Sequence, residues 1–244
     1  MRRILIASVG AGFIMFGNLA CVHAESTVRH TVIIDSIGST APILSLKQFK
    51  KLRSQAKVMV LDTRSGDDFL EGFIPNSINI GFKGPFDKFL LQIFPDKTQK
   101  LLLIADLGDA MSVSEHLSKL GYTNVMGVLD GGIWSWQGSE KTVNVSNIAA
   151  RKFLEKSKQG HIVDVRTDKE FAGGHIDNAM NIPLTDFVNF DIVLKAVDDQ
   201  VYVHCQSGYR SAIAISILSA KGFKNICNIQ GGYRALQEEI KENQ

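Results

Sequence analysis

The stretch that decides the fold is VYVHCQSGYRS, residues Val201 to Ser211. Its first four residues, Val201 to His204, are mostly apolar and β-branched or aromatic, which predicts a buried strand. The segment from Ser211 to Ala220 is rich in alanine and isoleucine, which predicts a helix packed on a sheet. Cys205 therefore lies in a short loop that joins a strand to a helix.

The residues around Cys205 suit a reactive thiolate. Free N–H groups at a helix N-terminus and the positive end of the helix dipole stabilise an anion placed there, and Arg210 adds a fixed positive charge. A cysteine in such surroundings ionises more readily than an ordinary one. Gly208 allows the positive φ and the close backbone approach that a loop curled around one sulfur requires. We predict that Cys205 is a nucleophile.

Motifs on both sides of this loop resemble those of the rhodanese family. The loop has the pattern Cys205-x-x-Gly208-x-Arg210-Ser211. The flanking motifs are Asp164-x-Arg166-x-x-x-Glu170-Phe171, Gly174-His175-Ile176, Ala179-Met180-Asn181-Ile182-Pro183-Leu184 and Gly231-Gly232-Tyr233. The resemblance covers the second half of the chain completely and the first half more weakly.

An internal repeat predicts two domains. The matching segments are Leu61-Asp62-Thr63-Arg64 with Val163-Asp164-Val165-Arg166, Asn76 to Ile80 with Asn178 to Ile182, and Asp130-Gly131-Gly132 with Gln230-Gly231-Gly232. The offset is about one hundred residues throughout. Each copy alternates short β-branched runs with helical segments, which predicts an α/β fold with a parallel sheet flanked by helices. We expect domains at residues 43–137 and 146–244, with a polar linker between them.

The first copy lacks the residues that would make its loop reactive. Alignment of the two copies places Ala105 opposite Cys205 and Ala110 opposite Arg210, whereas Gly108 still faces Gly208. Asp106 has entered the same loop together with Asp109, and two carboxylates would repel an anionic sulfur donor. We expect a catalytically silent first domain that shapes the domain interface, binds a partner or stabilises the second domain.

The resemblance implies a sulfurtransferase without a cofactor. Cys205 would attack the outer sulfur of a donor such as thiosulfate and hold it as a persulfide, and a thiol or cyanide would then accept it. Arg210 would bind the anionic donor. The remaining loop residues, which we expect to line the substrate site, are Gln206, Ser207, Gly208, Tyr209 and Ser211. Partners would be small sulfur compounds, with a protein sulfur acceptor as a further option.

The sequence also predicts roles for individual residues in and near the loop. Tyr209 should place its ring at the pocket mouth, where it could touch donor or acceptor. Asp164 and Arg166 recur in the silent copy, which favours an internal ion pair or hydrogen bond that supports the loop. His175 is opposite Phe73, and His204 is opposite Ile104, so structural roles are favoured for both.

Two other functions fit parts of the pattern. Cysteine phosphatases and arsenate reductases also use a Cys-to-Arg loop, but Cys205 and Arg210 enclose four residues, one fewer than the phosphate-cradling loop. A tighter ring suits one sulfur atom better than a tetrahedral oxyanion. The second alternative is a sulfur carrier or regulatory binding protein that holds a persulfide for a dedicated partner.

The first residues predict a secretory signal. Arg2 and Arg3 form a positive segment, and an apolar stretch follows. The sequence Val22-His23-Ala24 is typical of a cleavage signal. We expect a signal peptide at residues 1–24, an extension at 25–42 and a periplasmic mature protein without a membrane span. Lipidation at Cys21 is the rival hypothesis, but Asn18 stands where a lipoprotein motif has an aliphatic residue.

Charge and cysteine content narrow the partners. The chain has 27 basic and 25 acidic residues, and loss of Arg2 and Arg3 with the leader would remove the small excess. Without a basic tail, nucleic acid is not an expected partner.

Cys227 aligns with Met126, so we expect it to fill a buried strand position. No Cys-x-x-Cys or His-x-x-x-His spacing is present, and no metal is expected. Trp134 and Trp136 are expected in the core or an interface.

Overall fold

The computed structural model describes residues 40–156, 160–187 and 199–242. The predicted signal peptide and most of the predicted 25–42 extension lie outside the described residues. Phe187, at the end of the second described range, is buried in the core. No helix in the described part of the chain combines the length and the apolar character that crossing a membrane requires.

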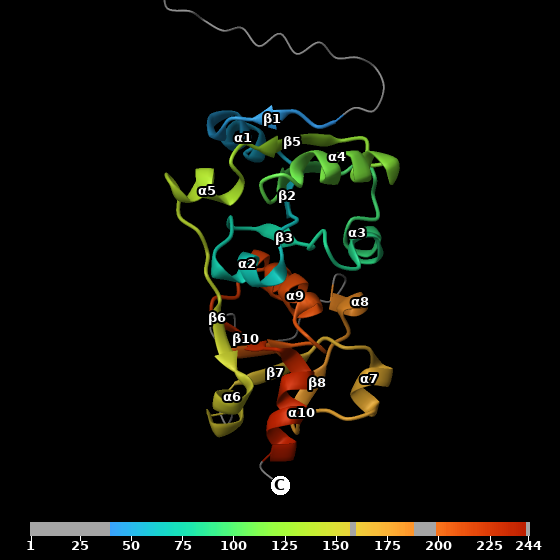
Figure 1. Cartoon of the computed structure of the whole chain (residues 1–244), viewed down its shortest axis with the longest axis vertical. Coiled ribbons are helices and arrows are strands. Elements are labelled where there is room, and N and C mark those ends of the chain that lie inside the picture. Colours follow the sequence, from blue (N-terminus) through green and yellow to red (C-terminus); the bar gives the residue numbers. More distant parts are fainter. Residues whose placement is uncertain (1–39, 157–159, 188–198, 243–244) are drawn as a thin grey trace, which may run out of the picture. The chain divides into compact units, whose positions relative to one another are not determined.

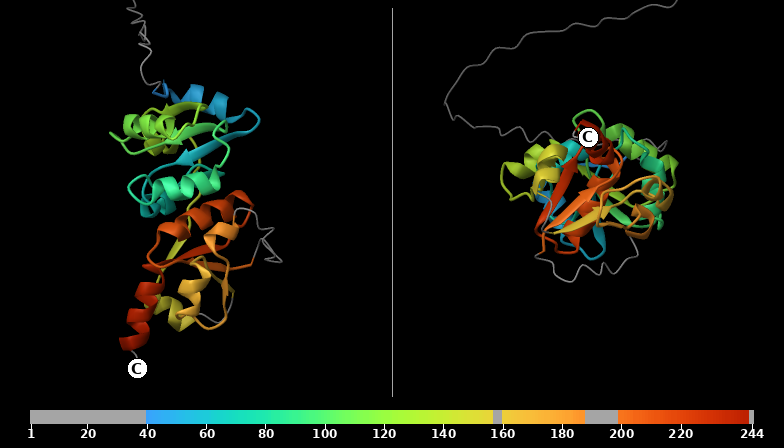
Figure 2. Two further views of the ribbon diagram at one scale, coloured as in Figure 1. Left: turned by 90° about the vertical axis from the view of Figure 1, so that its right-hand side faces the viewer. Right: turned by 90° about the horizontal axis from the view of Figure 1, so that it is seen from below.

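Two five-stranded parallel sheets form the framework, and their strand orders are equivalent. The first sheet has the order β1-β5-β4-β2-β3 and the second the order β6-β10-β9-β7-β8. In Figure 1 the elements of the first sheet run from blue to green and those of the second from yellow to red. Helices flank each sheet (Figure 2). The predicted class, an α/β fold with two repeated parallel-sheet domains, is therefore confirmed.

The elements divide evenly between the two domains. The first domain comprises β1 (Ile43–Leu44), α1 (Leu46–Arg53), β2 (Val58–Asp62), α2 (Gly66–Glu71), β3 (Ser77–Asn79), α3 (Phe86–Ile93), β4 (Lys100–Ile104), α4 (Ala110–Lys119), β5 (Val125–Leu129) and α5 (Gly132–Gln137). The second domain comprises β6 (Ser146–Ala149), α6 (Ala150–Lys156), β7 (His161–Asp164), α7 (Asp168–Ala172), β8 (Ala179–Asn181), α8 (Leu184–Phe187), β9 (Val201–His204), α9 (Tyr209–Ala220), β10 (Ile226–Gln230) and α10 (Gly232–Glu242).

Alternation along the strands sends side chains to opposite faces of each sheet. In β4, Leu101 and Leu103 join one core cluster, whereas Leu102 and Ile104 join another. The larger cluster also contains residues of β9, such as Val203. One continuous apolar core therefore includes side chains of both domains.

Helix α9 is central to that shared core. All residues from Ser211 to Leu218 are buried, because α9 contacts β9 and β10 of its own sheet and also β3 and α2 of the first domain. The Asn79 N–H at the edge strand β3 donates to Ser216 Oγ at 3.1 Å. The helix thus covers a sheet edge that would otherwise be open.

Two tryptophans near the end of the first domain differ in burial. Trp136 is buried, and its Nε1 donates to the Lys141 carbonyl at 3.0 Å. Trp134 is 73% exposed, so of the two expected positions the core is excluded for this residue, and an interface position stays a prediction. Residues two apart on a helix face different directions, so only one of the pair can face the sheet.

Candidate active site

Cys205 directly follows β9, at the carboxyl end of the second sheet. Its side chain is buried, and the Gly208 N–H donates to Cys205 Sγ at 3.1 Å. The Cys205 carbonyl accepts the Tyr233 N–H at 2.7 Å at the start of α10. Gly232 permits this close approach, since a Cβ there would lie 2.5 Å from the same carbonyl oxygen. The loop is therefore fixed from two sides, and its sulfur accepts a backbone hydrogen bond.

Gly208 owes its identity to backbone conformation. Its φ is +118°, and a Cβ built there would meet no atom within 4 Å. The residue is the N-cap of α9, which begins at Tyr209, two residues before the expected start at Ser211. The cause is the turn at Gly208, which brings the helical backbone closer to Cys205 than the apolar pattern indicates. A side chain at this position would be strained without being crowded.

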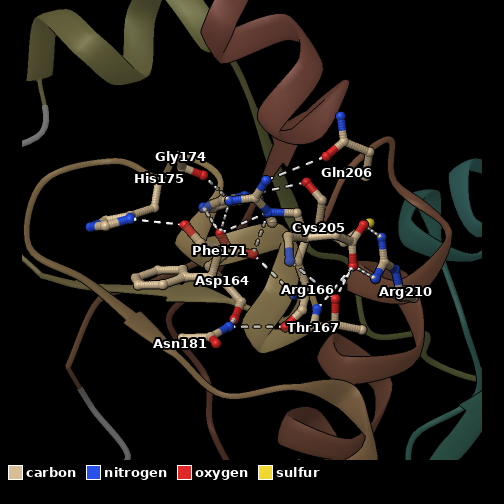
Figure 3. A network of polar contacts seen from close by, with 12 residues as sticks. Asp164, Arg166, Thr167, Phe171, Gly174, His175, Asn181, Cys205, Gln206 and Arg210 are labelled. Carbon is tan, nitrogen blue, oxygen red and sulfur yellow. Dashed lines mark hydrogen bonds and ion pairs between the residues drawn. The ribbon is translucent and has the colours of Figure 1, made fainter.

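Arg210 lies beside the Cys205 sulfur and is paired with Glu170. The guanidinium makes a two-pronged contact with the carboxylate, at 2.6 Å from Nη1 to Oε2 and at 2.7 Å from Nη2 to Oε1 (Figure 3). This hydrogen bonding from Arg210 lowers the pKa of Glu170 to about 2. Glu170, and secondarily the Cys205 thiolate, raise the pKa of Arg210. The expected cation is present, and its orientation is set by a carboxylate from α7.

The sequence pattern includes Glu170 in a motif but does not identify it as the partner of Arg210. Glu170 also closes the N-terminal capping box of α7 with Thr167. The equivalent residue in the first domain is Asp68, whose carboxylate accepts the Ser65 hydroxyl at 2.5 Å, and the residue that aligns with Arg210 there is Ala110. The exchange of both partners together is the signal in the repeat that could have identified this pair.

Replacement of Glu170 by glutamine should destabilise the folded protein in a pH-dependent manner. Glutamine retains the capping box, so the change isolates the charge. A carboxylate whose pKa is lowered on folding contributes stability that is fully present above its ordinary pKa of 4.5 and is lost as the pH falls toward about 2. Thermal unfolding midpoints of wild type and Glu170→Gln should therefore differ most at neutral pH and converge below about pH 4.5.

The matched control for this prediction is Asp68→Asn in the first domain. Asp68 has the same capping position but no arginine partner at Ala110. Its replacement should not reproduce the pH dependence of Glu170→Gln. Equal pH profiles for the two variants would contradict the assigned role of the Arg210 ion pair.

The ion pair that the repeat predicts is present in both domains. Arg166 Nη2 lies 2.6 Å from Asp164 Oδ2, and the corresponding Arg64–Asp62 distance is 2.7 Å. Both pairs are buried. The Asn181 side chain donates to the carbonyls of Asp164 and Arg166 at 3.0 and 2.9 Å. These bonds fix the turn after β7, the strand next to β9.

Arg166 also connects this buried pair with the Cys205 loop. Its Nη1 donates to Gln206 Oε1 at 3.4 Å (Figure 3), and its guanidinium lies 3.7 Å from the centre of the Tyr233 ring. In the first domain the equivalent Arg64 Nη1 donates to the Asp68 carbonyl at 3.2 Å. The supporting role expected for Asp164 and Arg166 thus has a direct structural route through Gln206.

The two serines of the loop occupy different surroundings. Ser207 is exposed, whereas Ser211 is buried at the start of α9. The Ser211 hydroxyl lies 2.8 Å from the Gly208 carbonyl and 3.1 Å from Asn228 Oδ1. Asn228 in β10 was not identified from the sequence as a neighbour of the loop. Ser211 supports the turn, and Ser207 faces solvent.

The two histidines near the loop, His175 and His204, each lie close to a backbone carbonyl. His175 stacks on Phe171, and its Nδ1 lies 3.0 Å from the Phe171 carbonyl (Figure 3). His204 is fully buried, with Nδ1 3.3 Å from the Cys205 carbonyl and Nε2 3.8 Å from Asp164 Oδ2. Burial lowers the pKa of His204, which keeps the imidazole neutral at pH 7.

Cys227 occupies the strand position that its alignment predicts. It lies in β10, opposite Tyr202 and Ser146 of the neighbouring strands, and is buried. Burial raises the pKa of the Cys227 thiol to about 11. Cys227 is therefore a neutral thiol at physiological pH and a poor nucleophile.

The loop of the first domain retains the backbone shape without the chemistry. Ala105 follows β4, Gly108 has a φ of +97°, and α4 begins at Ala110. Asp109 lies 2.9 Å from Lys83 Nζ, so the carboxylate that entered this loop is paired within the same domain. The local backbone therefore matches the alignment of the two loops.

Tyr209 lies against the first domain. Its hydroxyl donates to the Gly81 carbonyl at 2.7 Å, and its ring packs against Phe89 with the centroids 5.6 Å apart. The ring is therefore held by the first domain, and its contact with donor or acceptor stays a prediction. The sequence of the loop alone could not show that a segment 128 residues away supplies the partner.

Comparisons with known proteins agree with this architecture. The family description "Rhodanese-like domain" matches residues 45–139 and 149–239. Thiosulfate sulfurtransferase 18 of Arabidopsis thaliana is 34% identical over 110 residues, which span 40% of this chain and 79% of that protein. The putative sulfur carrier protein YrkF of Bacillus subtilis is 29% identical over 104 residues, or 43% of this chain and 56% of that protein.

Solved structures include a similar protein. The rhodanese-like domain protein of Staphylococcus aureus is 35% identical, with a TM-score of 0.34, and the match covers 38% of this chain and 91% of that one. The two family matches together span more than half of the present chain. The chain therefore belongs to the rhodanese-like family and carries two copies of its domain.

Proposed function

We propose that the protein is a sulfurtransferase in which Cys205 carries the transferred sulfur. The observation that carries this proposal is the Cys205 sulfur at the end of β9, which accepts the Gly208 N–H and lies beside Arg210. A backbone donor and a guanidinium at one sulfur stabilise negative charge on it. Membership of a family that includes named sulfurtransferases supports the same chemistry.

The proposed reaction has two displacement steps. The Cys205 thiolate attacks the outer sulfur of thiosulfate, the sulfur–sulfur bond of the donor breaks, and its electron pair leaves with sulfite. The enzyme then holds a Cys205 persulfide. Cyanide or a thiol attacks the outer sulfur, which restores the thiolate and gives thiocyanate or a new persulfide. No external oxidant or reductant is needed in either step.

The surroundings of Cys205 favour a small transferred group. The side chain of Cys205 is buried, and four residues separate it from Arg210. A single outer sulfur fits this arrangement better than a phosphate or arsenate with several oxygens to be cradled. We therefore propose sulfur transfer in preference to phosphatase or arsenate reductase activity.

Steady-state kinetics test this proposal. Initial rates of thiocyanate formation, with thiosulfate and cyanide both varied, should give the parallel double-reciprocal lines of a double displacement. Phosphatase assays with the same preparation test the alternative function. Phosphate release without thiocyanate formation would overturn the proposal.

A sulfur-carrier role is the second candidate. It is favoured by the similarity to a protein named as a putative sulfur carrier. A carrier would load sulfur onto Cys205 but release it slowly to cyanide. Rapid thiocyanate turnover would exclude this role in favour of the enzyme.

We also propose that the protein is exported with cleavage after Ala24. The proposal rests on the positive, apolar and small-residue segments at the start of the sequence. Expression of the full chain in a bacterium should yield a periplasmic protein whose first residue is Glu25. A lipid-modified Cys21, or retention of the uncleaved chain in the cytoplasm, would contradict it.

A further inference from the structure

The Tyr209 side chain connects the Cys205 loop with the silent domain. Tyr209 is the first residue of α9 and follows Gly208, whose N–H contacts the Cys205 sulfur. Its hydroxyl donates to the Gly81 carbonyl, and its ring packs against Phe89. Burial raises the pKa of Tyr209, so the hydroxyl stays a neutral donor. The residue next to the sulfur-binding amide is therefore held by the other domain.

Two glycines of the first domain make room for this ring. A Cβ on Gly84 would overlap the Tyr209 ring, and one on Gly81 would lie 3.4 Å from Tyr209 Cε2. Gly84 does not have the left-handed φ that would by itself require glycine. Its lack of a side chain therefore matters through the approach of Tyr209. We call Gly81, Gly84 and Phe89 the Tyr209 socket.

The next turn of α9 is in equally close contact with the first domain. A Cβ on Gly66 would lie 2.8 Å from Ala212 Cβ, so α2 and α9 also meet at a glycine. Further along, the Asn79 N–H donates to Ser216 Oγ. These contacts hold the part of α9 that follows the Cys205 loop against β3 and α2. The orientation of its first turn is thus determined jointly by both domains.

We propose that Tyr209 is a positioning residue, through which the silent domain holds the Gly208 N–H on the Cys205 sulfur. The kinetic part of this inference rests on the proposed sulfur transfer. When Tyr209 is seated in its socket, the N-cap of α9 is fixed and the backbone donor keeps its distance to the sulfur. The first domain thereby contributes to the reaction without a catalytic residue of its own.

The decisive variants alter the two sides of this contact separately. Gly84→Ala should displace the ring, and Tyr209→Ala should empty the socket. Each should lower kcat for thiocyanate formation by about 10- to 100-fold, because small misplacements of reacting groups have effects of that size. The KM for thiosulfate should change less than kcat, because the proposed contact acts on the position of the Gly208 N–H. Tyr209→Phe keeps the ring and should retain most of the turnover.

The combination of the two changes gives a test that is specific to the contact. Once Tyr209→Ala has removed the ring, Gly84→Ala has nothing to displace, so the double variant should be no slower than Tyr209→Ala alone. Gly138→Ala is the control, since a Cβ there meets no atom closer than 3.6 Å and its φ is −64°. It should leave kcat unchanged. Fully additive losses in the double variant would overturn the proposal.

A measurement independent of turnover separates this inference from the proposed function. The ¹⁵N–¹H resonance of the Gly208 amide should shift in Gly84→Ala and Tyr209→Ala, but not in Gly138→Ala. A shift in a protein that transfers no sulfur would reject the proposed function and retain the positioning contact. An unchanged resonance with an unchanged kcat, at a temperature where all variants are folded, would show that Tyr209 serves stability alone and would overturn the inference.

Discussion

Replacement of Cys205 by serine should reduce thiocyanate formation from thiosulfate and cyanide to the uncatalysed background. The loss should be about 1000-fold or more, because removal of a covalent nucleophile abolishes the intermediate. The hydroxyl of serine cannot replace the thiolate, since it stays protonated even next to the Gly208 N–H. Initial rates at saturating thiosulfate measure the effect directly.

Cys227→Ser is the matched control for this variant. Cys227 is the other described cysteine, it is buried in β10, and its thiol has a pKa raised to about 11. Its replacement should leave the rate within about twofold of wild type, with a modest loss of stability from a buried hydroxyl. A rate loss in Cys227→Ser equal to that in Cys205→Ser would contradict the assignment of the nucleophile.

The second large effect is expected for Gly208→Ala. The φ of +118° is unfavourable for alanine, so the loop should adopt another conformation and withdraw the N–H from Cys205 Sγ. Loss of one preorganised backbone donor costs about 10²- to 10³-fold in comparable sites. The kcat of the purified variant should fall by this amount.

Gly222→Ala separates the catalytic effect from backbone strain. Gly222 follows α9 with a φ of +94°, and a Cβ there also meets no atom within 4 Å. Both variants should lower the thermal midpoint by a similar amount, because each forces alanine into a glycine conformation. Only Gly208→Ala should lose the large factor in kcat. Equal kcat losses would show that the amide of Gly208 has no special role.

The repeat explains why the fold was accessible from the sequence. The Asp-x-Arg and Gly-Gly motifs recur with one offset, so each strand of the second sheet has a counterpart in the first. The strand from Val201 to His204 has the predicted bounds. The start of α9 was displaced by two residues, because Tyr209 and Arg210 do not continue the apolar pattern that marks the rest of the helix.

The contacts of the site were harder to predict, because they join residues distant in sequence. Arg210 meets Glu170 across 40 residues, and Tyr209 meets Gly81 across 128. Local pattern identifies the nucleophile and the nearby cation, since both belong to one loop. It does not identify which carboxylate or carbonyl the fold brings to them. The difference between the two copies, with Asp68 and Ala110 in place of Glu170 and Arg210, is the information that a single sequence does contain.

The most direct test of the account is the intact mass of the protein after incubation with thiosulfate, and again after addition of cyanide. Wild type should gain one sulfur and lose it as thiocyanate appears, Cys227→Ser should behave in the same way, and Cys205→Ser should gain none. A wild-type protein that gains no sulfur, or a Cys205→Ser variant that still gains it, would contradict sulfur transfer through Cys205.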